Sequence, residues 1–71
     1  VADAERVFQA ILKSDPLHAN TLNFLGYMLA DRGQRLAEAL ALIDRALVAE
    51  PGNPAFLDSR GWALFKLGRA A

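Results

Sequence analysis

The sequence predicts an all-α fold of about four helices, and three observations support this prediction. Alanine and leucine dominate a composition that is 54% hydrophobic, and charged residues are spread among them. β-Branched residues are few, and no alternating Val/Ile/Thr run is long enough to predict a strand. Breakers in "KSDPLHAN", "DRGQR" and "EPGNP" separate four segments, so we predict helices near residues 2–14, 18–32, 36–49 and 54–68.

Each predicted helix has an identifiable stop or an apolar face. Pro16 disfavours helical geometry at the residue before it and so ends the first helix, and Pro51 does the same for the third. Gly33 can adopt the left-handed conformation that ends the second helix, and we expect Gly68 to end the fourth. Apolar stripes at helical spacing are Val7, Phe8, Ile11 and Leu12, then Leu22, Leu25, Met28 and Leu29, then Leu36, Ala39, Leu40, Ile43 and Leu47.

Length and charge exclude several classes of protein. A chain of 71 residues forms at most one domain. Eight Lys and Arg residues balance eight Asp and Glu residues, so no net field attracts phosphate backbones or anionic lipid. No run is long and apolar enough to span a bilayer, and no signal-peptide pattern opens the chain. We therefore expect a soluble chain, in the cytoplasm or the periplasm, without a nucleic-acid partner or direct membrane insertion.

The chain also repeats itself. A shift of 35 positions superimposes apolar, glycine and proline residues on residues of the same kind, which is what stacked copies of one helix pair require. The superimposed pairs include Ala4 and Ala39, Phe8 and Ile43, Pro16 and Pro51, Leu22 and Leu57, Gly26 and Gly61, Tyr27 and Trp62, and Leu29 and Leu64.

These residues resemble the tetratricopeptide repeat (TPR), a helix-turn-helix unit of about 34 residues with the pattern W-x2-L-G-x2-Y, then A-x3-F, then P. The complete copy reads Leu22-x2-Leu25-Gly26-x2-Leu29, then Ala39-x3-Ile43, then Pro51. The resemblance, which is greatest to bacterial versions, implies antiparallel helix pairs stacked as a right-handed α-solenoid. It makes residues 1–17 the second helix of a repeat, 18–53 one complete repeat, and 54–71 the first helix of the next. We expect a fragment of a longer TPR protein.

The register makes specific packing predictions. Gly26 and Gly61 lie within helices, where glycine costs about 1 kcal/mol relative to alanine, so we expect close approach of the partner helix of the same repeat at each. Leu57 and Leu64 are expected to face that partner too. Two features depart from the family pattern: an extra residue in "GQRLAEA", which predicts a differently shaped turn, and Arg60, which stands where leucine is usual.

Residues that could support catalysis are sparse. His18 has no second partner for nucleophilic or acid–base chemistry, and cysteine is absent, so no zinc-binding spacing exists. No glycine-rich phosphate-binding loop is present. We predict a protein that is not an enzyme and has no cofactor or metal, with His18 as a solvated turn residue.

The resemblance implies that the first helix of each repeat lines a concave groove. Tyr27 and Trp62 then occupy equivalent positions in consecutive repeats, and amphipathic aromatic residues beside amides and carboxylates suit binding of a peptide. The alternative is that both rings merely cover the edge of the core. The predicted protein-binding residues are Asn20, Asn23, Tyr27, Asp31, Asp58, Trp62, Phe65 and Lys66.

Three functions remain in competition. The first is a scaffold or adaptor module that binds a protein or peptide segment in the groove, and the second is a structural spacer or end-to-end self-association element. The third, nucleic-acid binding, is disfavoured by the balanced charge. Asp31 and Asp58 also argue against the basic clamp with which one TPR subtype binds acidic carboxyl termini, and they favour a neutral or basic partner segment.

Overall fold

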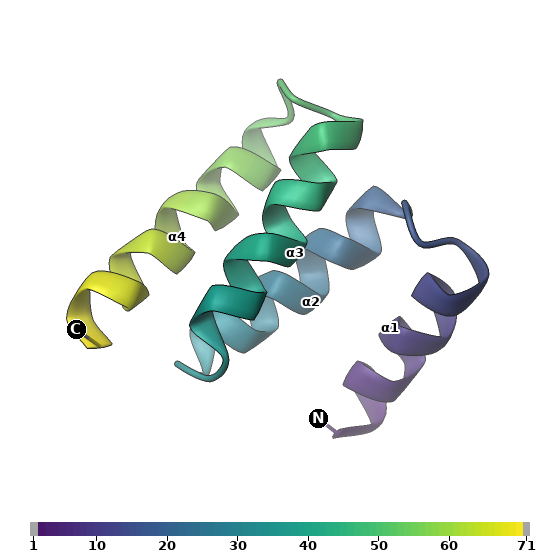
Figure 1. The fold of residues 1–71 in the computed structure, drawn as a ribbon, viewed down its shortest axis with the longest axis horizontal. Helices are drawn as coiled ribbons and strands as arrows, with labels where there is room; N and C mark the ends of the chain where they lie inside the picture. Colours follow the sequence, from purple (N-terminus) through teal and green to yellow (C-terminus); the bar gives the residue numbers. More distant parts are fainter. Residues whose placement is uncertain (1, 71) are drawn as a thin grey trace.

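The computed structural model describes the backbone of residues 2–70 and the side chains of residues 5–69. Over this range the chain forms helices α1 (Ala2–Ser14), α2 (Ala19–Asp31), α3 (Leu36–Ala49) and α4 (Pro54–Ala70), with no strand. Consecutive helices are joined by short turns, and α3 lies in front of α2 with α4 and α1 to either side (Figure 1). The predicted all-α fold is confirmed, and each predicted boundary lies within two residues of the observed one.

Two helix ends follow directly from local sequence. Gly33 has a φ of 69° after the end of α2. Its N–H donates to the Ala30 carbonyl at 2.9 Å, and the next N–H, that of Gln34, donates to the Leu29 carbonyl at 3.0 Å. This pair of hydrogen bonds is the Schellman motif, which satisfies carbonyls left free at a helix end. The prediction that Gly33 ends the second helix is therefore confirmed.

The prediction that Gly68 ends the fourth helix is wrong, because α4 continues to Ala70. Gly33 is the only described glycine with a positive φ, so Gly68 keeps an ordinary helical backbone. Glycine permits the left-handed conformation at low cost but does not impose it. The end of a helix therefore also depends on the residues that follow, and here the helix simply carries on through the glycine.

Side-chain caps begin α2 and α4. His18 precedes α2, and its Nδ1 accepts a hydrogen bond from the Thr21 N–H at 3.3 Å. Asn53 precedes α4, and its Oδ1 accepts from the N–H groups of Ala55 at 2.9 Å and Phe56 at 3.3 Å. Such caps satisfy N–H groups that have no partner within the helix. His18 is exposed as predicted, but it is a capping residue rather than a merely solvated one.

The turn before α3 contains an unusual backbone conformation. Arg35 has a φ of 48° and a ψ of 49°, the left-handed region that a non-glycine residue occupies only at some cost. Its guanidinium is held by Glu5 of α1 at 2.6 Å and lies 3.7 Å from Glu38 of α3. The hydrogen bond and the charge of Glu5 raise the pKa of Arg35. These ion pairs favour the strained turn and connect it to α1.

The core lies mainly between α2 and α3, the most extensive helix pair in the described structure. A Cβ atom added at Gly26 would lie 2.6 Å from Ile43 Cγ1 and 2.8 Å from the Ala39 carbonyl oxygen. The predicted close approach of the partner helix at Gly26 is therefore confirmed. The buried apolar residues are Leu12, Leu22, Leu25, Leu29, Ala30, Ala39, Leu42, Ile43, Ala46, Phe56 and Ala63.

The same packing prediction is not tested for α4, because the partner helix of that repeat is not among the described residues. Leu57 and Leu64 are 49% and 42% exposed, and a Cβ at Gly61 would meet no atom within 4 Å. The face of α4 that packs on α2 and α3 carries Phe56 and Ala63 instead. The Leu57 face is exposed because the described chain holds no second helix after α4 to cover it. Arg60, at the edge of this face, pairs its Nε with Asp44 Oδ1 of α3 at 2.8 Å.

No described helix combines the length and the apolar character needed to cross a membrane.

Candidate functional site

The predicted protein-binding residues come from α2 and α4, two helices that pack directly against each other. Tyr27 is 44% exposed and Phe65 is 52% exposed, while Asn23 is only 8% exposed. Trp62 and Lys66 are half-buried. The remaining members, all exposed, are Asn20, Asp31 and Asp58.

An aromatic and cationic cluster occupies the second half of α4. The rings of Trp62 and Phe65 stack with centroids 5.6 Å apart and an interplanar angle of 23°. Lys66 Nζ lies 5.2 Å from the Trp62 ring centroid, and Arg69 Cζ lies 5.7 Å from that of Phe65. Each cation is four residues after its ring, the spacing that brings side chains together on a helix. The structure thus brings three predicted residues together and adds Arg69, which that spacing could have identified.

Two polar atoms in the candidate site have no hydrogen-bond partner among the described residues. They are Asn23 Oδ1 and Trp62 Nε1, and both are buried. Leaving a buried polar group unpaired costs about 1–3 kcal/mol. Both atoms are covered by neighbouring groups, so they are not contact points that the described surface presents to a partner.

Tyr27 does not take part in any of the described ring stacks. In the described part of the chain Trp62 stacks with Phe65 of its own helix, and the other stacked pair is Phe8 of α1 with Phe24 of α2, 6.3 Å apart. The placement of Tyr27 and Trp62 side by side on one groove wall stays a prediction. Tyr27 is nevertheless exposed enough for its ring to contact a partner.

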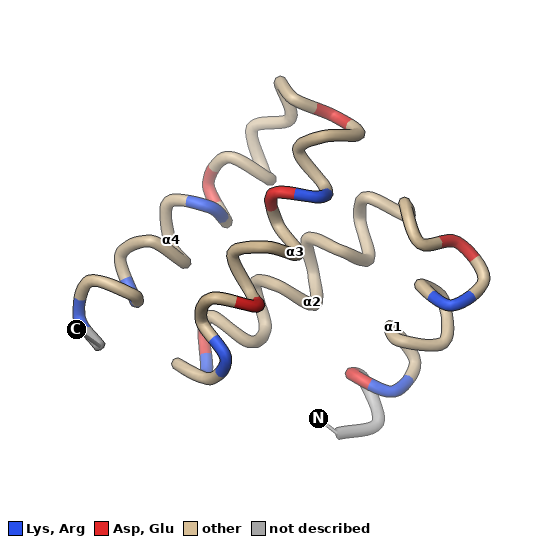
Figure 2. Tube along the Cα trace, in the orientation of Figure 1, with Lys and Arg blue, Asp and Glu red and all other residues tan. Residues whose placement is uncertain are grey.

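Charges of both signs are distributed along the helices (Figure 2). Among the described side chains Asp31 and Asp58 form no ion pair, whereas Arg35 and Arg60 each bind a carboxylate. The acidic members of the candidate site are thus available to a partner's cation, while Lys66 lies over the Trp62 ring. No group of His, Asp or Glu among the described residues could hold a metal ion.

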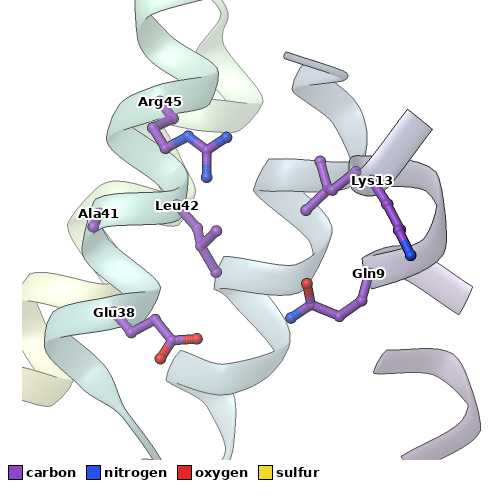
Figure 3. A pocket seen from close by; sticks show the side chains of 7 residues that line it. Gln9, Lys13, Glu38, Ala41, Leu42 and Arg45 are labelled. Atoms are coloured by element: carbon purple, nitrogen blue, oxygen red, sulfur yellow. The ribbon is translucent and has the colours of Figure 1, made fainter. Parts of the chain in front are cut away.

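Sequence reasoning missed a hollow of about 650 Å³ between α1 and α3. Leu42 and Arg45 project from α3 toward α1, and Gln9 projects from α1 toward α3 (Figure 3). Two arginine contacts join α1 and the turn after it to α3 and the turn before it: the Arg35–Glu5 ion pair and a 2.8 Å hydrogen bond from Arg45 Nη2 to the Pro16 carbonyl. Each joins residues about thirty positions apart, so no local motif indicates them. The other lining residues are Leu12, Lys13, Glu38 and Ala41.

The chain consists of antiparallel helices, and α4 begins 35 residues after α2, about one repeat length. This arrangement defines a helical-repeat protein. The family model of the tetratricopeptide repeat matches residues 1–54 and 34–71. The chain belongs to the tetratricopeptide repeat family. Proteins of this family are in general scaffolds for protein–protein interaction.

A TPR repeat-containing protein of Pseudomonas aeruginosa is 41% identical to this chain over 71 residues. The match covers all of this chain and 12% of that protein, so the chain spans about an eighth of the relative's length. No solved structure matches the chain.

Proposed function

We propose that the chain is a protein-interaction module in which α2 and α4 together bind a segment of a partner protein. The observation that carries this proposal is the exposure of Tyr27 and Phe65, 44% and 52%, on two helices that pack against each other. Aromatic side chains are enriched at protein interfaces because they bury a large area for little loss of conformational entropy. Phe65 also stacks on Trp62, which holds both rings in place.

The polar residues of the site indicate the chemistry of the partner. Asp31 and Asp58 are exposed and unpaired among the described residues, so they favour a neutral or basic segment. The proposed ligand is therefore an apolar peptide segment with a basic residue near its edge.

Alanine substitution in the natural protein tests this proposal. Tyr27→Ala combined with Trp62→Ala should reduce partner capture at least tenfold, whereas Val48→Ala on α3, where the side chain is 80% exposed, should leave capture unchanged. The tenfold threshold corresponds to about 1.4 kcal/mol. Circular dichroism must show that the double variant still folds. Retained capture by a folded double variant would overturn groove binding and favour a spacer.

Photo-cross-linking supplies a second readout that does not depend on stability. A photoreactive amino acid at Tyr27 should cross-link to one defined segment of a partner, and the same residue at Val48 should not. Equal cross-linking from both positions would contradict a specific α2–α4 site.

A second candidate function is a structural spacer or self-association element. One observation favours it: the open face of α4, where Leu57 and Leu64 are half-exposed and Gly61 meets no other side chain. This face adjoins the aromatic residues of the groove proposal, because Phe65 lies four residues after Gly61, on the same side of the helix, whereas Trp62 points in a different direction.

A further inference from the structure

The hollow between α1 and α3 is a surface separate from the candidate site on α2 and α4, with which it shares no residue. Its volume of about 650 Å³ lies within the range of ligand-binding pockets. Leu12 of α1 and Leu42 of α3 line it and are buried, so they offer an apolar floor. Gln9 reaches into it from α1 (Figure 3). The hollow thus combines apolar and polar contacts on two described helices.

Two cations line the end of the hollow next to the turn that follows α1. Arg45 Nη2 donates to the Pro16 carbonyl at 2.8 Å, which holds the guanidinium beside this turn and leaves its other N–H groups able to bind a carboxylate. Lys13 is the lining residue of α1 nearest the turn, and it forms no ion pair with another described residue. Asp15 lies in the same turn and accepts a hydrogen bond from the Leu17 N–H at 3.3 Å. One carboxylate against two cations leaves this end positive.

The opposite end of the hollow is acidic. Glu38 stands seven residues before Arg45 on α3, which separates them by roughly 10 Å along the helix axis. Arg35 lies 3.7 Å from Glu38 and holds Glu5 at 2.6 Å, so two carboxylates share one guanidinium. Figure 3 shows Glu38 and Arg45 on either side of Leu42 along the α3 wall. The hollow therefore offers a cationic end, an apolar middle and an acidic end.

We propose that this hollow binds a short extended peptide segment with an acidic residue at one end, apolar residues in the middle and a basic residue at the other end. The acidic side chain lies against Arg45 and Lys13, and the basic one against Glu38. The apolar side chains cover Leu12 and Leu42. A span of roughly 10 Å corresponds to about three residue steps of extended chain, so four residues reach from end to end. This site is independent of the proposed α2–α4 site.

The polar groups of the hollow favour a peptide over an acyl chain or a simple anion. The Gln9 side chain has both a donor and an acceptor, which a peptide backbone can satisfy together. An acyl chain would set Gln9 and Glu38 against apolar atoms, and an unsatisfied polar group of this kind costs free energy. A simple anion would use the cationic end alone and leave Leu42 without a contact.

Titration of isotope-enriched chain with a probe peptide, followed by NMR, tests the proposal. The probe is the tetrapeptide Lys-Leu-Leu-Glu, acetylated and amidated so that only its side chains carry charge. The amide signals of Gln9, Leu42 and Arg45 should shift and saturate, while that of Val48, on another face of α3, should not. The neutral counterpart Gln-Leu-Leu-Gln should bind about fivefold more weakly, because exposed ion pairs each contribute little.

Charge-neutral variants identify the two ends of the site. Lys13→Gln and Glu38→Gln change exposed side chains and should each weaken binding of the charged peptide about twofold without affecting the neutral one. Arg45→Gln should weaken it more, but it also removes the hydrogen bond to Pro16, so Lys13→Gln keeps the test valid if that variant unfolds. The matched control is Arg32→Gln, an exposed position at the end of α2, which should bind as the unmodified chain does.

Three outcomes would overturn the proposal. The first is the absence of saturable shifts at the hollow up to millimolar peptide, and the second is equal affinity for the charged and neutral peptides. The third is shifts of the same size with sodium phosphate or with octanoate alone, which would assign the hollow to a simple anion or to an acyl chain.

Discussion

Helices α2 and α4 carry the same pattern of residues in different surroundings. Both place leucine, glycine and leucine at equivalent positions, yet Leu29 is fully buried while Leu64 is 42% exposed. Gly26 is pressed against Ile43, and Gly61 faces open space. The difference is that α3 lies beside the one face, whereas the described residues include no comparable helix beside the other. The same residues therefore contribute differently to stability according to their neighbours, and substitutions at equivalent positions measure this directly.

The largest difference is expected for leucine truncation. Leu29→Ala should lower the free energy of unfolding by about 2–5 kcal/mol, because it leaves a cavity in the core. Leu64→Ala should lower it by about 1 kcal/mol or less, because its side chain is already partly hydrated. Urea denaturation followed by circular dichroism measures both. Equal losses would mean that the α4 face is covered in solution.

The next largest effect is expected at the first glycine. Gly26→Ala forces a Cβ atom against the Ala39 carbonyl, which is backbone and cannot rotate away. We expect a loss of about 1–3 kcal/mol from overpacking, only partly offset by the helix preference of alanine. Thermal denaturation should show a lower Tm, and an unchanged or higher Tm would contradict the close α2–α3 contact.

The second glycine should respond with the opposite sign. Gly61→Ala adds a methyl group in open space and should raise the free energy of unfolding by about 0.5–1 kcal/mol through helix propensity. The free energy of unfolding should be measured at low micromolar concentration, where self-association does not contribute. A loss of stability comparable with that of Gly26→Ala would show that the two environments are alike.

The smallest effect concerns a position where a leucine of the α2 pattern is replaced by arginine in α4. Leu25 of α2 is buried, whereas its counterpart Arg60 forms an ion pair with Asp44. The side chains of Arg60 and Asp44 are each a little under half exposed. A double-mutant cycle with Arg60→Ala and Asp44→Ala should give a coupling free energy of about 0.2–1 kcal/mol that decreases with added salt. A coupling that does not respond to salt would indicate packing rather than charge.

Local sequence signals predicted most of the fold. Pro16, Gly33 and Pro51 placed the turns, and the leucines and Gly26 of α2 placed its buried face, because each of these effects depends on a few neighbouring residues or on a partner helix within the chain. The same pattern predicts a partner helix at Gly61, and this prediction stays untested because the described residues include no helix after α4.

The candidate site was less predictable. The sequence placed its residues on α2 and α4, but the unpaired Trp62 Nε1 and the contact of Lys66 with Trp62 depend on side-chain conformation. Arg60 was expected at a packing position and instead reaches Asp44, sixteen positions earlier in the chain. The hollow lies between α1 and α3, and the arginine contacts Arg35–Glu5 and Arg45–Pro16 join segments distant in sequence, so no spacing rule indicates them.

Those two arginine contacts have a consequence for local stability. Helix α1 packs on α2 alone, and the links to the α3 side come from exposed Arg35 and Arg45 rather than from a shared apolar layer. The exposed Arg35–Glu5 ion pair weakens in salt, and segments with few buried side chains open most readily. Backbone amides of α1 should therefore exchange hydrogen with solvent faster than those of α2 and α3, and added salt should widen the gap.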